Sequence, residues 1–175
     1  TGRIGKGRRR RALTTEQVAS LTSAKLQSLS SAQIGALTTD QLAALSTDQI
    51  TGLRPDQVRS ISASSFGALT TDQIGALDYR QVSQLSASQL GALDASHLGA
   101  ISTNGLAGMS SGQLRALTTD QVQALGSDQI QALSAGQVRS FTTTQVASLT
   151  TDQWAALTTD QVRSFSNAQI AAFTT

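Results

Sequence analysis

Few residues in this chain have side chains suited to catalysis or metal binding, and those few are not clustered. There is one histidine, His97, and no cysteine, so disulfides and thiolate metal sites are excluded. A serine nucleophile needs a histidine that is held by a carboxylate, and no such set can be assembled around His97. The sequence also has no glycine-rich phosphate loop and no calcium-binding nonapeptide. We therefore predict no catalytic residue, no metal site and no cofactor.

The strongest charge feature is a basic segment at the start of the chain. Residues 1–12 carry six positive charges, whereas residues 13–175 have seven basic and eleven acidic side chains. Such a segment could bind phosphate groups or an acidic surface. It has no interleaved aromatic residues and no attached nucleic-acid-binding fold, so we interpret it as a flexible arm or a tether to an acidic neighbouring subunit rather than a nucleic-acid contact. Its predicted contact residues are Arg3, Lys6, Arg8, Arg9, Arg10 and Arg11.

The rest of the chain is built on a repeat of eight residues. An apolar residue, the anchor, recurs at every eighth position from Leu13 to Phe173 without a slip, and these anchors enclose twenty octads. The consensus is L-[ST]-x-[D/x]-Q-[VIL]-x-[AS], and its sixth position is apolar in all twenty octads. A fixed period of this kind is the signature of a repeat array, in which neighbouring units stabilise one another.

The residue types in each octad predict a short helix that begins after the anchor. The second position is Ser, Thr, Asp or Gly in every octad except that of Arg54, and the fifth is Gln in sixteen of twenty. This pair forms a capping box, and the anchor and the sixth position form a hydrophobic staple. All eleven acidic residues lie at the cap or in the first turn, where the helix dipole favours negative charge. Pro55 lies at the first helical position, where proline is favoured.

A few positions depart from this consensus. His97 replaces the glutamine of its octad, and we interpret it as a substitute cap. Trp154 occupies a sixth position and is expected in the core, whereas Tyr79 and Arg80 are expected to be exposed. The stretch 105–109 lacks the glutamine and carries two glycines, so it is the expected weak point of the array.

We predict an all-α solenoid of very short capped helices, one per octad, over residues 13–175, preceded by the basic arm of residues 1–12. A continuous helix is excluded because eight residues at about 100° each would rotate the apolar stripe by about 80° per octad. A β-solenoid remains the alternative, since strands could bury both faces. Alternate octads show no systematic difference, so the sequence leaves open whether two or three octads complete one superhelical turn.

The unit L-T-T-D-Q-[VI]-x-A-L resembles the octapeptide-repeat tracts of large bacterial surface or secreted proteins, and the resemblance covers residues 13–175. It implies a bacterial origin, an extracellular or cell-surface location, and a structural or adhesive role. Such tracts have no catalytic residues to carry over.

We therefore expect a non-enzymatic rod or head-to-tail filament subunit that associates with copies of itself. The sequence stops shortly after the anchor Phe173 without a polar capping repeat, and an uncapped apolar end invites a second molecule, so Phe173 is a predicted contact residue. The alternatives are a ligand- or partner-binding repeat module, adhesin-like or binding nucleic acid through the basic arm, and an ice-binding protein with rows of threonine. No apolar run is long enough to span a membrane.

Overall fold

The structure, a computed structural model, describes residues 13–172. This part of the chain forms twenty α-helices, one in each octad, and contains no strand, so the predicted all-α solenoid is confirmed and the β-solenoid alternative is wrong. The helices are α1 (Thr15–Ala19), α2 (Ser23–Ser28), α3 (Ser31–Gly35), α4 (Thr39–Ala43), α5 (Thr47–Thr51), α6 (Pro55–Ser60), α7 (Ala63–Phe66), α8 (Thr71–Gly75), α9 (Tyr79–Ser83), α10 (Ala87–Gly91), α11 (Ala95–Ala100), α12 (Thr103–Ala107), α13 (Ser111–Ala116), α14 (Thr119–Gln123), α15 (Ser127–Ala132), α16 (Ala135–Arg139), α17 (Thr143–Ala147), α18 (Thr151–Ala156), α19 (Thr159–Ser164) and α20 (Asn167–Ala171).

Each helix begins at a capped residue, as the sequence predicts. At α4 the extended N-cap Thr38 accepts a hydrogen bond from the backbone N–H of Gln41, and the Gln41 side-chain oxygen accepts one from the backbone N–H of Thr38. At α6 and α15 the N-caps Arg54 and Gly126 have no side-chain acceptor, so only the glutamine half of the box forms.

The helices end because the chain returns to extended backbone at or near the next anchor. Leu29, which follows α2, has φ −70° and ψ 149°, and Leu117, which follows α13, has φ −66° and ψ 140°. No residue of the described chain has a positive φ, so these corners need no left-handed glycine. A helix therefore lasts little more than one turn before the chain changes direction.

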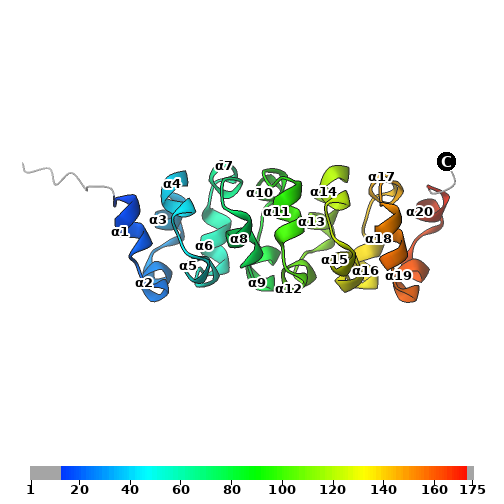
Figure 1. Ribbon diagram of the computed structural model, residues 1–175, viewed down its shortest axis with the longest axis horizontal. Helices are drawn as coiled ribbons and strands as arrows, with labels where there is room; N and C mark the ends of the chain where they lie inside the picture. The colour runs from blue at the N-terminus through cyan, green and yellow to red at the C-terminus, as the bar shows by residue number, and fades with distance from the viewer. Residues whose placement is uncertain (1–12, 173–175) are drawn as a thin grey trace, which may run out of the picture.

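Three octads complete one turn of the superhelix. Each helix packs against the helix three further along the chain, as α3 does with α6, α6 with α9, and α9 with α12. Residues 24 apart therefore occupy equivalent places in successive turns. Figure 1 shows the result, a straight rod in which α4, α7 and α10 lie along one edge and α1 and α20 lie at opposite ends.

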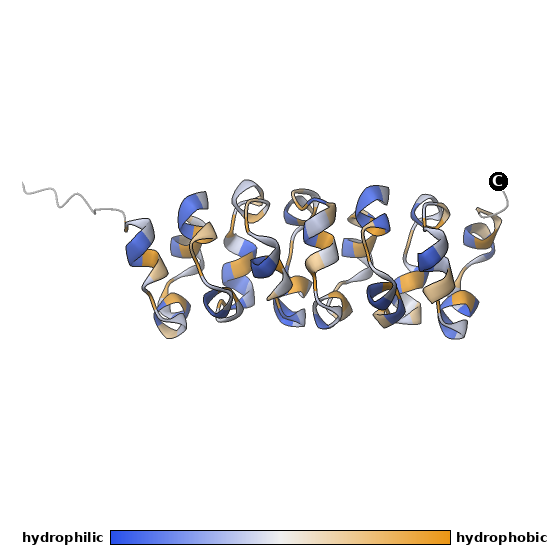
Figure 2. Cartoon of the chain, viewed as in Figure 1, coloured by the Kyte–Doolittle hydropathy of each residue, from blue (hydrophilic) through white to orange (hydrophobic). Residues whose placement is uncertain are grey.

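A single apolar core follows the axis of the rod. The sixth-position side chains from Val18 to Val146 are at most 1% exposed, and the anchors from Leu45 to Leu149 are at most 7% exposed. Every helix carries both hydrophobic and hydrophilic residues along the whole rod (Figure 2). Trp154 packs against this core, as expected for a sixth position, but it is only partly buried because it lies in the last turn.

Candidate functional site

The glutamines at the fifth position of the octads link successive turns. In Gln89, the side-chain oxygen accepts a hydrogen bond from the N-cap of its own helix, and Nε2 donates to the carbonyls of Val58 and Ile61 at 2.9 and 3.0 Å. These two carbonyls belong to a corner of the preceding turn, 31 and 28 residues earlier. One amide side chain therefore completes the start of its own helix and the end of another.

This arrangement recurs along the rod, and we call it the glutamine ladder. The glutamines that donate to a carbonyl 28 residues earlier are Gln41, Gln49, Gln57, Gln73, Gln81, Gln89, Gln113, Gln121, Gln129, Gln137, Gln145, Gln153, Gln161 and Gln169. All of them except Gln137 are at most 8% exposed. Buried polar groups are costly unless they are hydrogen-bonded, so the ladder provides polar contacts inside a core that is otherwise apolar.

A second, weaker link joins the seventh position of one octad to the eighth position of the octad one turn further on, 25 residues later. Arg115 Nε donates to the carbonyl of Ser140 at 3.0 Å, and Gln123 Nε2 donates to the carbonyl of Ser148 at 2.8 Å. Where the seventh residue is glycine, the backbones approach closely, and a Cβ on Gly67 would lie 2.5 Å from the carbonyl oxygen of Ala92. At Arg115, Gln123 and Gly67 the seventh position therefore faces the eighth position of the next turn, whereas no atom lies within 4 Å of a Cβ on Gly91.

Two interior octads lack a ladder side chain, and both have an isoleucine as their anchor. Ile61 precedes Ser65 and Ile101 precedes Gly105 by four residues. A Cβ on Gly105 would lie 3.0 Å from Ile101 Cγ2, which is closer than ordinary van der Waals contact. The place of a side chain at residue 105 is therefore crowded by Ile101 and by Leu77 and Val82 of the preceding turn, whereas Ser65 has a side chain after the other isoleucine.

His97 takes the place of a ladder glutamine. Its Nε2 lies 2.8 Å from the carbonyl oxygen of Leu69, 28 residues earlier, and its side chain is only 12% exposed. A carbonyl can only accept, so Nε2 carries the proton. The predicted role of His97 as a substitute cap is wrong, because only the Asp94 side chain caps α11 and no capping box forms there. His97 instead replaces the glutamine in its long-range contact with the corner of the preceding turn.

The carboxylate of Asp94 contacts the other polar groups close to His97. Its Oδ1 accepts hydrogen bonds from the Ser96 hydroxyl at 2.6 Å and the His97 backbone N–H at 3.0 Å, and it lies 2.9 Å from His97 Nδ1. These hydrogen bonds, that of Ser96 first, lower the pKa of Asp94 to about 2. The order of the three residues differs from a catalytic triad, because Ser96 bonds the carboxylate while the outer histidine nitrogen faces Leu69.

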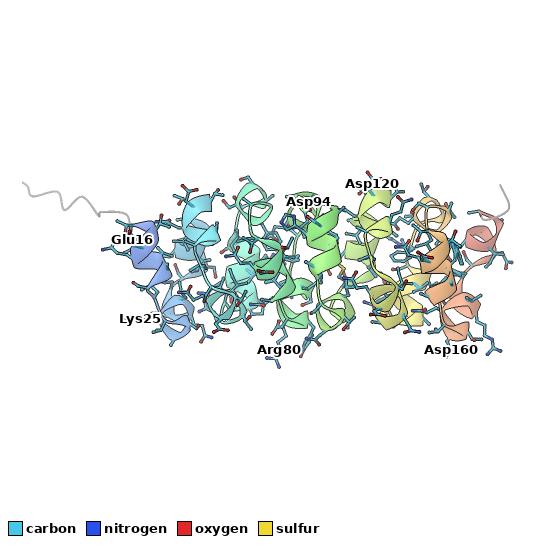
Figure 3. The ribbon with its side chains drawn as sticks, in the orientation of Figure 1. Glu16, Lys25, Arg80, Asp94, Asp120 and Asp160 are labelled. Carbon is cyan, nitrogen blue, oxygen red and sulfur yellow. The ribbon has the colours of Figure 1, made fainter. Side chains whose placement is uncertain are left out.

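Charged side chains lie mostly on the outside of the rod. Asp48, Asp72 and Asp120 are multiples of 24 residues apart and so belong to helices that stack in successive turns, and Asp94 is the N-cap of α11 in the same stack. In Figure 3, Asp94 and Asp120 point outward at one edge and Arg80 at the opposite edge. Within residues 13–172 no three His, Asp or Glu side chains lie close enough together to hold a metal ion.

The two ends of the rod expose apolar residues whose equivalents are buried in the interior turns. At the C-terminal end the sixth-position residues Val162 and Ile170 are each 43% exposed. At the N-terminal end the sixth-position residues are fully buried, but the anchor Leu13 is 43% exposed and Leu21 is partly exposed. Sixth positions therefore pack against the following turn and anchors against the preceding one, so the two ends of the described rod expose different apolar residues.

The contact residues predicted from the sequence lie outside the described part of the chain. They are Arg3, Lys6, Arg8, Arg9, Arg10, Arg11 and Phe173.

The repeat found in the sequence and the structure has a counterpart among known families. A family model described as "ALTTAQ repeat" matches residues 23–54, 43–79, 98–135 and 128–159, which together make up more than half of the chain. The chain belongs to the ALTTAQ repeat family. The comparison with curated proteins finds no match. In this chain the segment A-L-T-T-D-Q occurs at residues 36–41, 68–73, 116–121 and 156–161.

The long-range role of the glutamine in these ALTTAQ repeats was not predicted from the sequence. A capping box accepts either Glu or Gln at this position, yet the chain has Gln in sixteen octads and Glu in none. Only the amide has N–H groups that can donate to a distant carbonyl. The absence of Glu was therefore the signal for the ladder. Among the helices of residues 13–172, none is long and apolar enough to cross a bilayer.

Proposed function

We propose that this ALTTAQ repeat chain is a non-enzymatic structural protein, a rod that associates end to end with copies of itself in a bacterial extracellular or surface assembly. The observation that carries the proposal is that both ends of the described rod expose apolar residues, Val162 and Ile170 at one end and Leu13 at the other. Their equivalents in the interior turns are buried by the neighbouring turn, and a second copy can bury the end residues in the same way.

An end face resembles an interior turn with one neighbour removed. Burying the exposed parts of Val162 and Ile170 would contribute about 1 kcal/mol each, and the ladder bonds of a new turn would add to this. The two end faces differ, so the contact is head-to-tail. Contacts of this kind that do not close into a ring produce filaments.

The absence of an enzymatic role is part of the proposal, and it is supported by how the few reactive side chains are used. His97 and Asp94 are engaged in holding a corner and a helix start, and the fifth-position glutamines hold the turns together. The extracellular or surface location rests on the resemblance of the octad to tracts of bacterial surface and secreted proteins.

Sedimentation velocity over a range of protein concentrations tests the end-to-end association. We expect species larger than the monomer for the unmodified chain, and mainly monomer for Val162→Asp, because this change places a charge on the exposed C-terminal face. Gln131→Asp is the matched control, since Gln131 is exposed on the side of the rod and the same charge there should not affect association. Unchanged far-UV circular dichroism would show that both variants keep the fold.

A monomeric unmodified chain at every concentration and salt concentration would contradict end-to-end association. The chain would then be a monomeric spacer or a partner-binding repeat module. Equal loss of association in both variants would show that the contact is not at the end face.

A further inference from the structure

We infer that His97 forms a pH-sensitive link between two turns of the rod, which is complete when both ring nitrogens carry a proton and is weakened when one of them loses it. The link joins α11 to the corner that precedes α8, and α8, α11 and α14 stack in successive turns. It lies in the interior of the rod, so it does not depend on the proposed end-to-end association. Because His97 is the only histidine of the chain, its protonation can be measured by itself.

The first support is that each ring nitrogen of His97 faces an oxygen that can only accept. Nε2 lies 2.8 Å from the carbonyl oxygen of Leu69, and Nδ1 lies 2.9 Å from Oδ1 of Asp94. The pKa of Asp94 is about 2, so this carboxylate is charged wherever a histidine titrates. A neutral imidazole has one N–H and one lone pair. Either neutral tautomer therefore places a lone pair against an oxygen, and only the doubly protonated ring avoids this conflict.

The second support is burial, which keeps water from relieving that conflict. Nδ1 of His97 is buried and has no aligned hydrogen bond, although the Asp94 carboxylate lies close to it. The Asp94 side chain is 67% exposed at an edge of the rod (Figure 3), so solvent reduces the attraction between the two charges. The cost of losing a proton therefore falls mainly on the buried ring, where an acceptor without a donor is unfavourable.

The third support is the sign of the charges on the helices around His97. Helix α11 packs against α8, which carries Asp72, and against α14, which carries Asp120, and neither of these two helices has a lysine or arginine. Helices α7, α10 and α12 carry no charged side chain. In the described part of the chain Asp94 is the carboxylate within ion-pair distance of His97, and Asp72 and Asp120 act from further away. All of these charges favour the protonated ring.

The direction of the pH dependence follows from these contacts. The protonated ring is stabilised in the folded chain relative to the unfolded chain, where both nitrogens face water. The stabilisation is therefore fully present below about pH 6.5, where an ordinary histidine is protonated, and is lost as the pH rises. The contribution of Asp94 has the opposite sign and is lost only as the pH falls toward 2. The ladder glutamines have no titratable group, so they hold their turns together at either pH.

The octad that follows makes this link more important to the rod. Gly105 stands at the fifth position of α12 and has no side chain to reach the preceding turn. Loss of a proton from His97 therefore weakens the second of two consecutive links in a row, between the intact ladder contacts of Gln89 and Gln113. We expect any opening of the rod at high pH to be concentrated between these two glutamines.

Urea unfolding of the unmodified chain and of His97→Gln, at about pH 5 and about pH 8, tests the inference. His97→Gln restores the consensus side chain and its donor but removes the titratable group, and all other titratable groups are common to both chains. For the unmodified chain we expect the unfolding equilibrium constant to increase about tenfold between the two pH values, and for His97→Gln to change about twofold or less. Both chains are compared at one protein concentration, so that self-association affects them equally.

The same dependence on pH in the two chains would overturn the inference, whether or not the rods associate end to end. Nitrogen NMR of the histidine ring is the second measurement. We expect both ring nitrogens to carry a proton in the folded chain at about pH 7, where an ordinary histidine is mostly neutral. A ring with one proton at that pH, as in the urea-unfolded chain, would also overturn the inference. Asp94→Ser keeps a capping residue but removes the carboxylate, so it should reduce the pH dependence, and an unchanged dependence would contradict the role of Asp94.

Discussion

The glutamine at the fifth position is the residue on which most of the structure depends. It satisfies a backbone N–H at the start of its own helix and carbonyls at a corner one turn away, so a single side chain serves two functions. His97 shows that another side chain can fill the second of these functions if it carries a donor that reaches the corner carbonyl.

Replacing a ladder glutamine by glutamate should separate these two functions. Gln121→Glu keeps an acceptor for its own N-cap but places carboxylate oxygens against the carbonyls of Leu90 and Leu93, which now receive Nε2 at 2.8 Å each. Because Gln121 is only 4% exposed, we expect a loss of about 2–4 kcal/mol in the free energy of unfolding. Urea denaturation followed by circular dichroism measures this loss.

The matched control is Gln131→Glu, on the exposed surface, which should change stability by about 0.5 kcal/mol or less. Similar small effects of the two changes would mean that the ladder bonds contribute little. Similar large effects would mean that the added charge, rather than the lost donor, destabilises the rod.

The cap at each helix could be predicted from the sequence because its partners lie within four residues of one another. The distant carbonyls could not, since their spacing of 28 and 31 residues depends on how many octads complete a turn. The number of octads per turn is set by the backbone angles at each corner, where anchors such as Leu29 are extended. Similar side chains recur in every octad, so the sequence pattern is the same whether two or three octads complete a turn. Which residues are exposed at the two ends also depends on the number of octads per turn, so it could not be predicted from the sequence.

At the scale of elements, the helices are too short to form alone, because isolated helices of fewer than about 12 residues are marginal in water. They persist because each is capped and is packed against helices one turn before and after. Close packing between turns also restricts which residues fit at the corners. A Cβ on Gly108, which follows α12, would lie 2.1 Å from the backbone oxygen of Tyr79 at the start of α9.

Two glycine-to-alanine changes should therefore have opposite effects on stability. Gly108→Ala forces the backbones of α9 and α12 apart, and we expect a loss of about 1–3 kcal/mol. Gly91→Ala adds a methyl group in α10 where no atom lies within 4 Å and φ is not positive, so we expect a gain of about 0.5–1 kcal/mol. Thermal unfolding compares the two variants, and a destabilised Gly91→Ala with an unaffected Gly108→Ala would contradict the described contacts between turns.

At the scale of the whole molecule, the rod is a one-dimensional array whose every interior turn has two neighbours. Its end faces present the residues that interior turns use for those neighbours, sixth positions at one end and anchors at the other. In the proposed assembly, copies continue the fold through the same kind of apolar contacts.

Electron microscopy of the purified chain, over a range of concentrations, is the decisive test of end-to-end association. We expect unbranched rods of constant width whose lengths are multiples of one chain and increase with concentration. Single rods of one length at every concentration would contradict it.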